Sequence, residues 1–345
     1  MFWPASVAGF ARMKKSTSLT IHEVARLANV SSMTVSRALN NPERVSPDTL
    51  ARVNEVVRRT GYVPNGMAGS LRSSRARLVA ALLPTIVGQV FQETVQSLNQ
   101  TLDEHGYQLM IGQSGYESSR EDALLDAVVR RRPDGIVLTG VMHSPAGRRR
   151  LMTAGIPVVE TWDLTPTPID MLVGFSHDRI GEAVCAFLHG RGYRNLALIS
   201  ASDERARRRA EGFQRMSRAL GARGDLPALL VPAPSTLGAG RGALAELMSM
   251  HPSVDALFCS SDTLALGVLI EAQTRGLAVP GRLAVVGLGD QEFAAHLQPA
   301  LTTVRIDGTR IGRMAAELIV DRTEGRVVSE PIVDVGFEIV ERAST

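Results

Sequence analysis

The chain has 345 residues, 44% hydrophobic and 21% charged, which is ordinary globular composition for two or three domains at roughly 100–200 residues each. Two cysteines are too few for a disulfide framework or a metal cluster and indicate a reducing compartment. No apolar run reaches the roughly 18 residues of a membrane span, and the first residues make a poor signal peptide, so we expect a cytoplasmic protein. We expect residues 1–17 to form a disordered extension, and we expect no cofactor and no metal ion.

Basic residues are concentrated at the start of the chain. Residues 1–77 carry a net charge of +8, whereas the rest of the chain carries −5, which gives the total of +3. A small basic head on a mildly acidic body favours nucleic-acid binding. A merely solvated basic surface would explain the charge equally well, so the local pattern has to decide.

Local signals predict a first helix that begins at Ile21. Thr20 and Glu23 form a T-x-x-E capping box in front of it. Asn29 tolerates a left-handed backbone and can make the turn that follows. The predicted apolar face consists of Ile21, Val24, Ala25, Leu27 and Ala28.

A second helix is predicted over residues 32–39, with Ser31 as its cap. Pro47 then occupies the first position of a third helix, which Gly61 ends. Two short helices joined by a tight turn form a helix-turn-helix unit. The sequence therefore predicts a helix-turn-helix DNA-binding head over residues 18–63.

This head resembles the DNA-binding head of the LacI-type, or lactose-repressor, family of transcriptional regulators. The match covers about fifty consecutive residues and includes the motifs V-S-x-x-T-V-S-R-x-L-N and G-Y-x-P-N. The resemblance implies that the second helix lies in the major groove of double-stranded operator DNA. Ser32, Met33 and Arg37 would then reach base edges, with Arg37 bonding guanine and Met33 contacting a thymine methyl group.

Other residues of the head would contact the sugar-phosphate backbone and fix the register on DNA. By the same resemblance these are Ile21, Ser31, Thr34, Ser36, Asn40, Arg44 and Asn65. For Thr34 and Ser36, simple solvation of the surface is the alternative.

Residues 64–77 form the segment between head and body. In the family this segment becomes a short hinge helix in the minor groove, and Leu71 matches the leucine that is wedged between base steps. Two glycines here weaken the helix by about 1 kcal/mol each. We therefore expect the hinge to fold only when DNA and a second subunit hold it. A flexible linker without contacts of its own is the alternative.

Short aliphatic runs alternate with amphipathic segments from residue 78 onward. Such alternation predicts an α/β body with parallel sheets wrapped by helices, and there are too many runs for one sheet, so we expect two sheets with a cleft. Strands are predicted at residues 78–83, 107–111, 135–140, 156–160, 171–175, 195–200, 255–260 and 282–288. Helices are predicted at residues 91–105, 118–131, 180–191 and 205–220.

The body resembles the two-lobed, periplasmic-binding-protein-like effector domain of the same family, in which three crossovers join the lobes. We expect residues 78–345 to bind effector and to dimerise. The expected N-lobe is 78–161 plus 291–322, and the expected C-lobe is 163–288 plus the chain end. Within the family the body is most similar to gluconate-operon repressors, on stretches such as LLPTIVGQVFQETV, GIPVVETWDLTPTPIDMLVGFSH and VPGRLAVVGLGDQEFA.

Effector-binding candidates follow the ends of predicted strands, because ligands bind outside the carboxyl ends of parallel strands. Arg209 matches the family's R-x-x-G arginine, whose fork suits a carboxylate or a diol; a solvated helix face is the alternative. Asp262 is as well placed to cap a helix, and Trp162 to be part of the core. The other candidates are Thr85, Gln89, Phe91, Glu160, Asp163 and Asp290.

Enzyme motifs are missing from the sequence. It has no G-x-x-x-x-G-K-[ST] loop, no G-x-S-x-G and no H-E-x-x-H. The body alone would also fit a transport-linked sugar-binding protein. The DNA-binding head and the missing export signal argue against that class. We therefore interpret the chain as an effector-responsive DNA-binding transcriptional regulator, most simply a repressor.

The expected partners are operator DNA, a second copy of the chain and a small-molecule effector. A homodimer on a pseudo-palindromic operator follows from the head, because one head reads few bases. A dimer and not a tetramer is expected, since no leucine-heptad segment follows IVDVGFEIVE. The expected effector is a sugar acid such as gluconate, with its carboxylate at Arg209 and its hydroxyls near Glu160, Asp163 and Asp290. A neutral pentose or hexose is the alternative.

Overall fold

The computed structural model describes residues 19–62, 76–86, 91–115, 118–141, 144–222 and 226–345. The chain divides into two compact units, Met1–Ala76 and Arg77–Thr345, which we call the head and the body. The predicted extension at residues 1–17 and residues 64–75 of the predicted hinge lie outside the described residues. Among the described helices, none is both long and apolar enough to cross a membrane.

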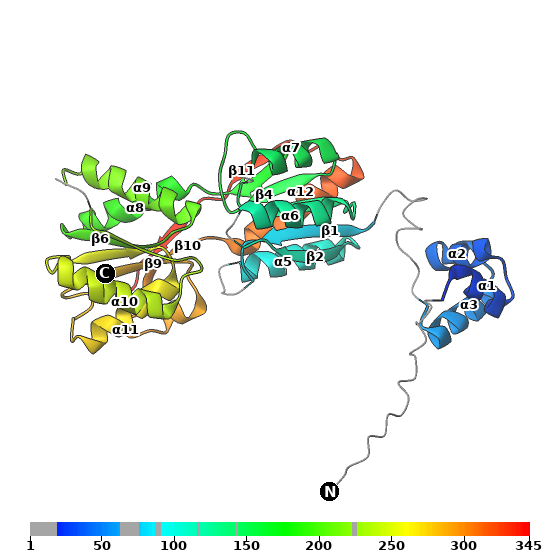
Figure 1. The fold of residues 1–345 in the computed structure, drawn as a ribbon, viewed down its shortest axis with the longest axis horizontal. Helices are drawn as coiled ribbons and strands as arrows, with labels where there is room; N and C mark the ends of the chain where they lie inside the picture. The colour runs from blue at the N-terminus through cyan, green and yellow to red at the C-terminus, as the bar shows by residue number, and fades with distance from the viewer. Residues whose placement is uncertain (1–18, 63–75, 87–90, 116–117, 142–143, 223–225) are drawn as a thin grey trace, which may run out of the picture. The chain divides into compact units, whose positions relative to one another are not determined.

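The described part of the head is helical (Figure 1). Its elements are α1 (Ile21–Ala28), α2 (Ser32–Asn40), the 3-10 turn η1 (Pro42–Arg44) and α3 (Pro47–Thr60). The predicted capping box is present, because the Thr20 side chain accepts from the backbone N–H of Glu23 and the Glu23 carboxylate accepts from that of Thr20. Asn29 makes the predicted turn with a φ of 52°.

Aliphatic side chains from all three helices fill the centre of the head. Its buried residues are Val24, Ala25, Ala28, Val35, Ala38, Val53 and Val56. The prediction that Leu27 faces inward is wrong, since this side chain is 40% exposed. Each residue turns about 100° around a helix, which carries Leu27 off the stripe formed by Val24 and Ala28. This core fixes which side chains α2 presents to solvent.

The body is built on two six-stranded sheets, each flanked by helices (Figure 1). The first sheet, with strand order β11-β5-β4-β3-β1-β2, defines the N-lobe, and the second, with order β12-β10-β9-β8-β6-β7, defines the C-lobe. Strand neighbours pair in parallel in both sheets, except that β10 and β12 are antiparallel. The predicted α/β architecture with two parallel sheets is confirmed.

The elements of each lobe come from separate parts of the chain. The N-lobe contains β1 (Leu78–Leu83), α5 (Gln92–Glu104), β2 (Gln108–Gln113), α6 (Ser118–Val129), β3 (Gly135–Thr139), α7 (Pro145–Ala154), β4 (Val158–Thr161), β5 (Met171–Gly174), α12 (Gly308–Glu324) and β11 (Ile332–Asp334). The C-lobe contains α8 (His177–Gly190), β6 (Leu196–Ala201), α9 (Glu204–Ala219), β7 (Ala228–Val231), α10 (Leu237–Met250), β8 (Ala256–Cys259), α11 (Asp262–Thr274), β9 (Ala284–Leu288), η2 (Glu292–Ala295), β10 (Thr302–Arg305) and β12 (Glu338–Val340).

Alternate residues of each strand pack against opposite helix layers. In β1, Val79 and Ala81 belong to the cluster that contains side chains of α5 and α12, whereas Ala80 and Leu82 belong to the cluster with α6 and α7. The C-lobe sheet lies in the same way between α8 and α9 on one face and α10 and α11 on the other (Figure 1). Strands covered on both faces explain why nearly continuous aliphatic runs marked them in the sequence.

Three segments cross between the lobes: from β5 to α8, from β10 to α12, and from β11 to β12. The three predicted crossovers are therefore present, but the lobe boundaries that we predicted are wrong in three places. β5 and β11 pair within the N-lobe sheet, and β10 pairs with β9 of the C-lobe. Each misplaced strand lies next to a crossover, where only pairing distant in sequence decides the lobe.

Helices α8 and α9 cross closely at two glycines. A Cβ on Gly212 would overlap the carbonyl oxygen of Asp178, and one on Gly181 would overlap that of Arg209. We expect Gly212→Ala to lower the stability of the body by about 1–3 kcal/mol, the usual cost of overpacking. The control is Gly190→Ala, because a Cβ there would meet no atom within 4 Å among the described residues. Thermal unfolding of both variants tests this, and equal melting temperatures would contradict it.

Candidate functional site

The outward surface of α2 carries the predicted base-reading residues. Met33 is 55% exposed, Arg37 is exposed and Ser32 is half-buried. All three follow Ser31, whose side chain caps α2 by accepting from the backbone N–H of Thr34. The N-terminal part of the second helix of a helix-turn-helix unit is the part that meets base edges. The arrangement is able to present these side chains to a major groove.

The predicted backbone-contacting residues have mixed surroundings. Thr34 hydrogen-bonds Ser31 through its hydroxyl at 2.8 Å, so it also supports the cap. Ser36 is half-buried, and Ile21 packs against the core of the head. Arg44 is exposed and forms a long ion pair of 3.8 Å with Glu43. The side chain of Asn40, and the whole of Asn65 and Leu71, lie outside the described residues.

His22 is a residue of this surface that the sequence pattern did not suggest. Its Nδ1 lies 2.9 Å from the hydroxyl of Ser32, which joins α1 to the start of α2. In the sequence, His22 is one polar residue among the apolar positions of a helix. Such a residue is too common to be identified as functional.

The body contains a cavity at the carboxyl ends of strands from both lobes. Its lining residues follow β1, β4 and β5 of the N-lobe and β6, β7, β8 and β9 of the C-lobe. They are Thr85, Phe91, Trp162, Phe175, His177, Ala201, Asp203, Arg205, Arg209, Ala233, Pro234, Ser235, Ser260, Ser261, Thr263, Leu288 and Gln291. The position agrees with the general rule for ligand sites in parallel α/β sheets. We call it the interlobe cavity.

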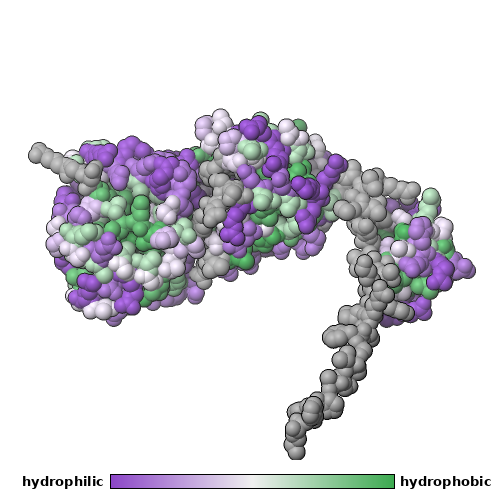
Figure 2. All heavy atoms as spheres, in the orientation of Figure 1, coloured by the Kyte–Doolittle hydropathy of each residue, from purple (hydrophilic) through white to green (hydrophobic). Residues whose placement is uncertain are grey.

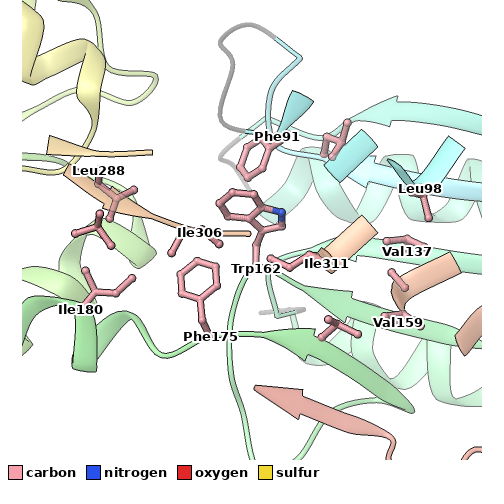
Figure 3. Close-up of a cluster of buried hydrophobic side chains, with 14 of the residues drawn as sticks. Phe91, Leu98, Val137, Val159, Trp162, Phe175, Ile180, Leu288, Ile306 and Ile311 are labelled. Atoms are coloured by element: carbon pink, nitrogen blue, oxygen red, sulfur yellow. The ribbon is translucent and has the colours of Figure 1, made fainter. Parts of the chain in front are cut away.

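Phe91, Trp162 and Phe175 form an aromatic wall of the interlobe cavity. Figure 3 shows their three rings close together. Trp162 makes edge-to-face contacts with Phe91 at 4.9 Å and with Phe175 at 5.6 Å between ring centroids. The Trp162 indole N–H donates to Thr94 at 3.0 Å, and its backbone has a φ of 62°, which is rare for a bulky residue. The wall supplies an apolar surface with a fixed orientation.

Arg209 and His177 form a buried pair whose protonation is set by their neighbours. The Nε2 of His177 lies 3.0 Å from the carbonyl oxygen of Trp162, which can only accept, so Nε2 carries the proton. Nδ1 then accepts from the guanidinium of Arg209 at 2.9 Å. Burial, followed by the charge of Arg209, lowers the pKa of His177 well below 6.5 and keeps it neutral. Burial also lowers the pKa of Arg209 to about 10, so it stays charged at neutral pH.

Arg209 lines the cavity, and the described residues hydrogen-bond its guanidinium incompletely. Besides His177 it reaches the carbonyl oxygen of Ser260 at 3.4 Å, but its Nε finds no hydrogen-bond partner among the described residues. Arg205, one turn earlier on α9, has a buried Nη1 that is likewise without a partner in the described part of the chain. Asp203 lies near both arginines, but a buried guanidinium whose donors are incompletely hydrogen-bonded is still costly, so the cavity is suited to an anion.

Glu160 and Asp163, predicted as effector ligands, do not line the interlobe cavity. Glu160 is fully buried and accepts from the backbone N–H of Ile169 at 2.8 Å. Asp163 forms an ion pair with Arg208 at 2.5 Å, and burial raises its pKa although Arg208 opposes the shift. Both carboxylates have partners within the protein and are not part of the cavity lining, so the predicted acidic end of the site does not coincide with this cavity.

Asp262 and Asp290 are also occupied. Asp262 accepts from the Thr303 hydroxyl at 2.6 Å and from the backbone N–H of Gln291 at 2.8 Å, and burial raises its pKa to about 6. The cap of α11 is its neighbour Ser261. Asp290 pairs with Arg305 and Arg342, each at 2.6 Å. Neither aspartate lines the interlobe cavity.

Thr85, Phe91, Trp162 and Arg209 are the predicted candidates that the structure brings together around the cavity. Gln89 lies outside the described residues. The sequence pattern missed other lining residues, among them Arg205, His177, Asp203 and Ser235. The described residues also hold no cluster of His, Cys, Asp or Glu arranged for a metal ion.

Comparisons with known proteins match both units. The family "Bacterial regulatory proteins, lacI family" matches residues 20–65, and the periplasmic binding protein-like domain matches residues 185–345. The HTH-type transcriptional regulator GntR of Pseudomonas aeruginosa is 36% identical over 327 residues, covering 94% of this chain and 95% of that protein. The regulator of the same name from Escherichia coli K12 is 31% identical over 329 residues, covering 95% and 98%. A solved LacI-family regulator from Silicibacter pomeroyi aligns with a TM-score of 0.89 and 34% identity, covering 94% of this chain and 99% of that one.

Proposed function

Because this chain belongs to the lacI family of bacterial regulatory proteins, we propose that it represses genes of sugar-acid use and is released from its operator by a gluconate-like inducer. Its relatives are transcriptional regulators, so the chain is a DNA-binding transcriptional regulator and not an enzyme. We propose that the regulator is a repressor, and we propose which inducer it binds and which residues bind that inducer.

On the DNA side, we propose that Arg37 bonds guanine and that Met33 contacts a thymine methyl group. Exposure of both side chains on α2 supports this assignment. Ser32 would read a base edge beside them, with His22 holding its hydroxyl. We keep the proposal that residues 64–77 form a hinge in the minor groove, with Asn65 and Leu71 in contact with DNA.

We propose a homodimer that places two heads on a pseudo-palindromic operator. Exposed apolar side chains at sheet edges support an interface between copies of the body. Leu230 on the edge strand β7 is 68% exposed, and Ile111 on the edge strand β2 is 46% exposed. Figure 2 shows apolar residues gathered on the visible face of the C-lobe between its two helix layers.

The observation that carries the inducer proposal is the buried guanidinium of Arg209 in the interlobe cavity. Its Nε is buried and finds no hydrogen-bond partner among the described residues, so the protein hydrogen-bonds this guanidinium incompletely. Arg209 is also oriented by His177, which has a fixed tautomer. Preorganised guanidinium groups bind planar anions well. We therefore place the carboxylate of the sugar acid at Arg209.

The hydroxyls of the inducer need different partners from those that we first expected. Glu160, Asp163 and Asp290 do not line the cavity, whereas Asp203 and Ser260 do. The Ser260 hydroxyl already accepts from the backbone N–H of Ala201 at 2.8 Å, which leaves its own O–H to donate. We propose that such groups, together with the aromatic wall, hold the polyol chain.

Calorimetry on the full-length protein with gluconate, phosphogluconate and neutral sugars tests the inducer class, with a gel shift on its upstream DNA for each ligand. We expect gluconate or a related sugar acid to bind and to release the DNA. Binding and release by neutral sugars alone would end the sugar-acid proposal and support a neutral-sugar repressor. Ligand binding without any effect on DNA would favour a sugar sensor that does not regulate genes.

A further inference from the structure

We propose that Arg205 is a second anion-binding residue, which selects the charged inducer and ties it to both lobes. The inference rests on the proposed function, because it assigns a role in binding the same inducer. It goes further by naming a residue that the sequence pattern did not single out.

Arg205 lies on α9 four residues before Arg209, so the two side chains lie on the same side of that helix. Both line the interlobe cavity, and the Arg205 side chain is only 14% exposed. Its ion pair with Asp203 is long, at 3.9 Å. Its buried Nη1 has no hydrogen-bond partner among the described residues. Arg205 is therefore a charged residue of the cavity lining whose guanidinium is incompletely hydrogen-bonded by the described residues.

The other two arginines of this part of α9 are satisfied. Arg207 is exposed and pairs with Glu204 and Glu211, while Arg208 pairs with Asp163. The contrast matters because all four arginines look alike in the sequence. Arg205 and Arg209, each with a buried nitrogen that has no hydrogen-bond partner in the described part of the chain, are the two that line the cavity.

The Arg205 guanidinium also reaches across to the N-lobe. Its Cζ lies 5.4 Å from the centroid of the ring of Phe91, the residue directly before α5. A guanidinium uses its face to stack on a ring, while its N–H groups donate within its plane. Arg205 is thus able to keep its contact with Phe91 and donate to a carboxylate at the same time. The inducer would then be joined to the C-lobe through α9 and to the N-lobe through Phe91.

Two arginines and one acid, Asp203, line the cavity, so the lining itself carries an excess of positive charge, which Glu121 and Asp163 outside the lining partly offset. Arg209 would be sufficient to bind a carboxylate. A second arginine would increase the selectivity for a charged inducer over a neutral sugar, because a neutral sugar leaves both guanidinium groups uncompensated. A ligand bound by Arg205 would also have a higher affinity for the lobe arrangement in which Phe91 lies beside Arg205 than for an arrangement in which the two residues are apart. Such differential binding is what allows a ligand to shift a conformational equilibrium.

The test is Arg205→Gln in the full-length protein, with Arg207→Gln as the matched control on the exposed side of α9. We expect Arg205→Gln to weaken gluconate binding by about tenfold or more, as loss of a charge-assisted bond does. Operator affinity without ligand should be unchanged. At saturating gluconate, the factor by which gluconate weakens operator binding should also fall, which a change in binding affinity alone would not produce. Arg205→Lys, which keeps the charge but loses the planar fork, should recover part of the gluconate affinity.

The outcomes separate this inference from the proposed function. If the unaltered protein binds no sugar acid, the proposed function fails before any variant is compared. If it binds gluconate and Arg205→Gln binds and responds as well as Arg207→Gln does, Arg205 has no role, while the proposed function stands. If Arg205→Gln does not fold by circular dichroism, the comparison uses Arg205→Lys, and an unchanged affinity and operator response in that variant would overturn the inference.

Discussion

Replacing Arg209 with methionine is expected to abolish release of the operator by the inducer while operator binding persists. Methionine keeps a long, flexible side chain in the cavity wall but removes the guanidinium. Losing one partner of a buried, hydrogen-bonded charge pair costs about 2–5 kcal/mol, which is roughly 30-fold or more in affinity. Calorimetry with gluconate and gel-shift titration with and without gluconate measure the two parts of this expectation.

Stability has to be controlled in that experiment, because Arg209 is also structural. Without its guanidinium, the Nδ1 of His177 loses its donor, at a cost of about 1–3 kcal/mol in the free energy of unfolding. Arg207→Met, on the exposed side of α9, is the matched control. A folded Arg209→Met protein that still responds normally to gluconate would remove Arg209 from the inducer site.

Replacing Arg37 with alanine is expected to cost about 1–3 kcal/mol in operator binding and to relax the base preference at one position of each half-site. The reason is that a bidentate arginine distinguishes guanine from other bases, whereas phosphate contacts carry no sequence information. Binding to a set of operators with single base changes measures this effect.

Arg44→Ala is the matched control for Arg37, because Arg44 is exposed in the same head but assigned to phosphate. It should weaken all DNA sequences to a similar extent and reduce the salt slope by about one. The base contact of Arg37 would be wrong if Arg37→Ala lowered specific and non-specific affinity equally.

Local signals were sufficient to predict the head. The capping box at Thr20, the left-handed turn at Asn29 and the stop at Gly61 depend on neighbouring residues, and the structure confirms all three. The exposure of Leu27 differed, because the helical rotation places it beside the stripe of Val24 and Ala28 and not on it.

In the body, local sequence signals predicted most strands but not their arrangement in the two lobes. Continuous aliphatic runs marked eight of the twelve described strands, but β7, β10, β11 and β12 were not among them, because they are short and partly exposed or rich in threonine. The lobe to which β5 and β10 belong is decided by pairing with β4 and β9, which local sequence does not reveal.

The residues of the interlobe cavity were likewise predictable only in part. Trp162 and Arg209 were predicted because each lies near the end of a strand or in a family motif. The position of the acids outside the cavity lining was not predictable, because their partners are far away in sequence: Asp163 pairs with Arg208, and Asp290 with Arg342. Arg205 was missed because only the fold distinguishes it from the other arginines of α9.

Reciprocal titration of operator and gluconate on the full-length protein tests the proposed function most directly. If gluconate occupies the interlobe cavity and releases the operator, it must weaken operator binding by some factor, and saturating operator must weaken gluconate binding by the same factor. We predict equal factors of about tenfold or more, in the usual range of allosteric coupling. Operator affinity that stays unchanged at saturating gluconate, with gluconate demonstrably bound, would contradict an inducer role.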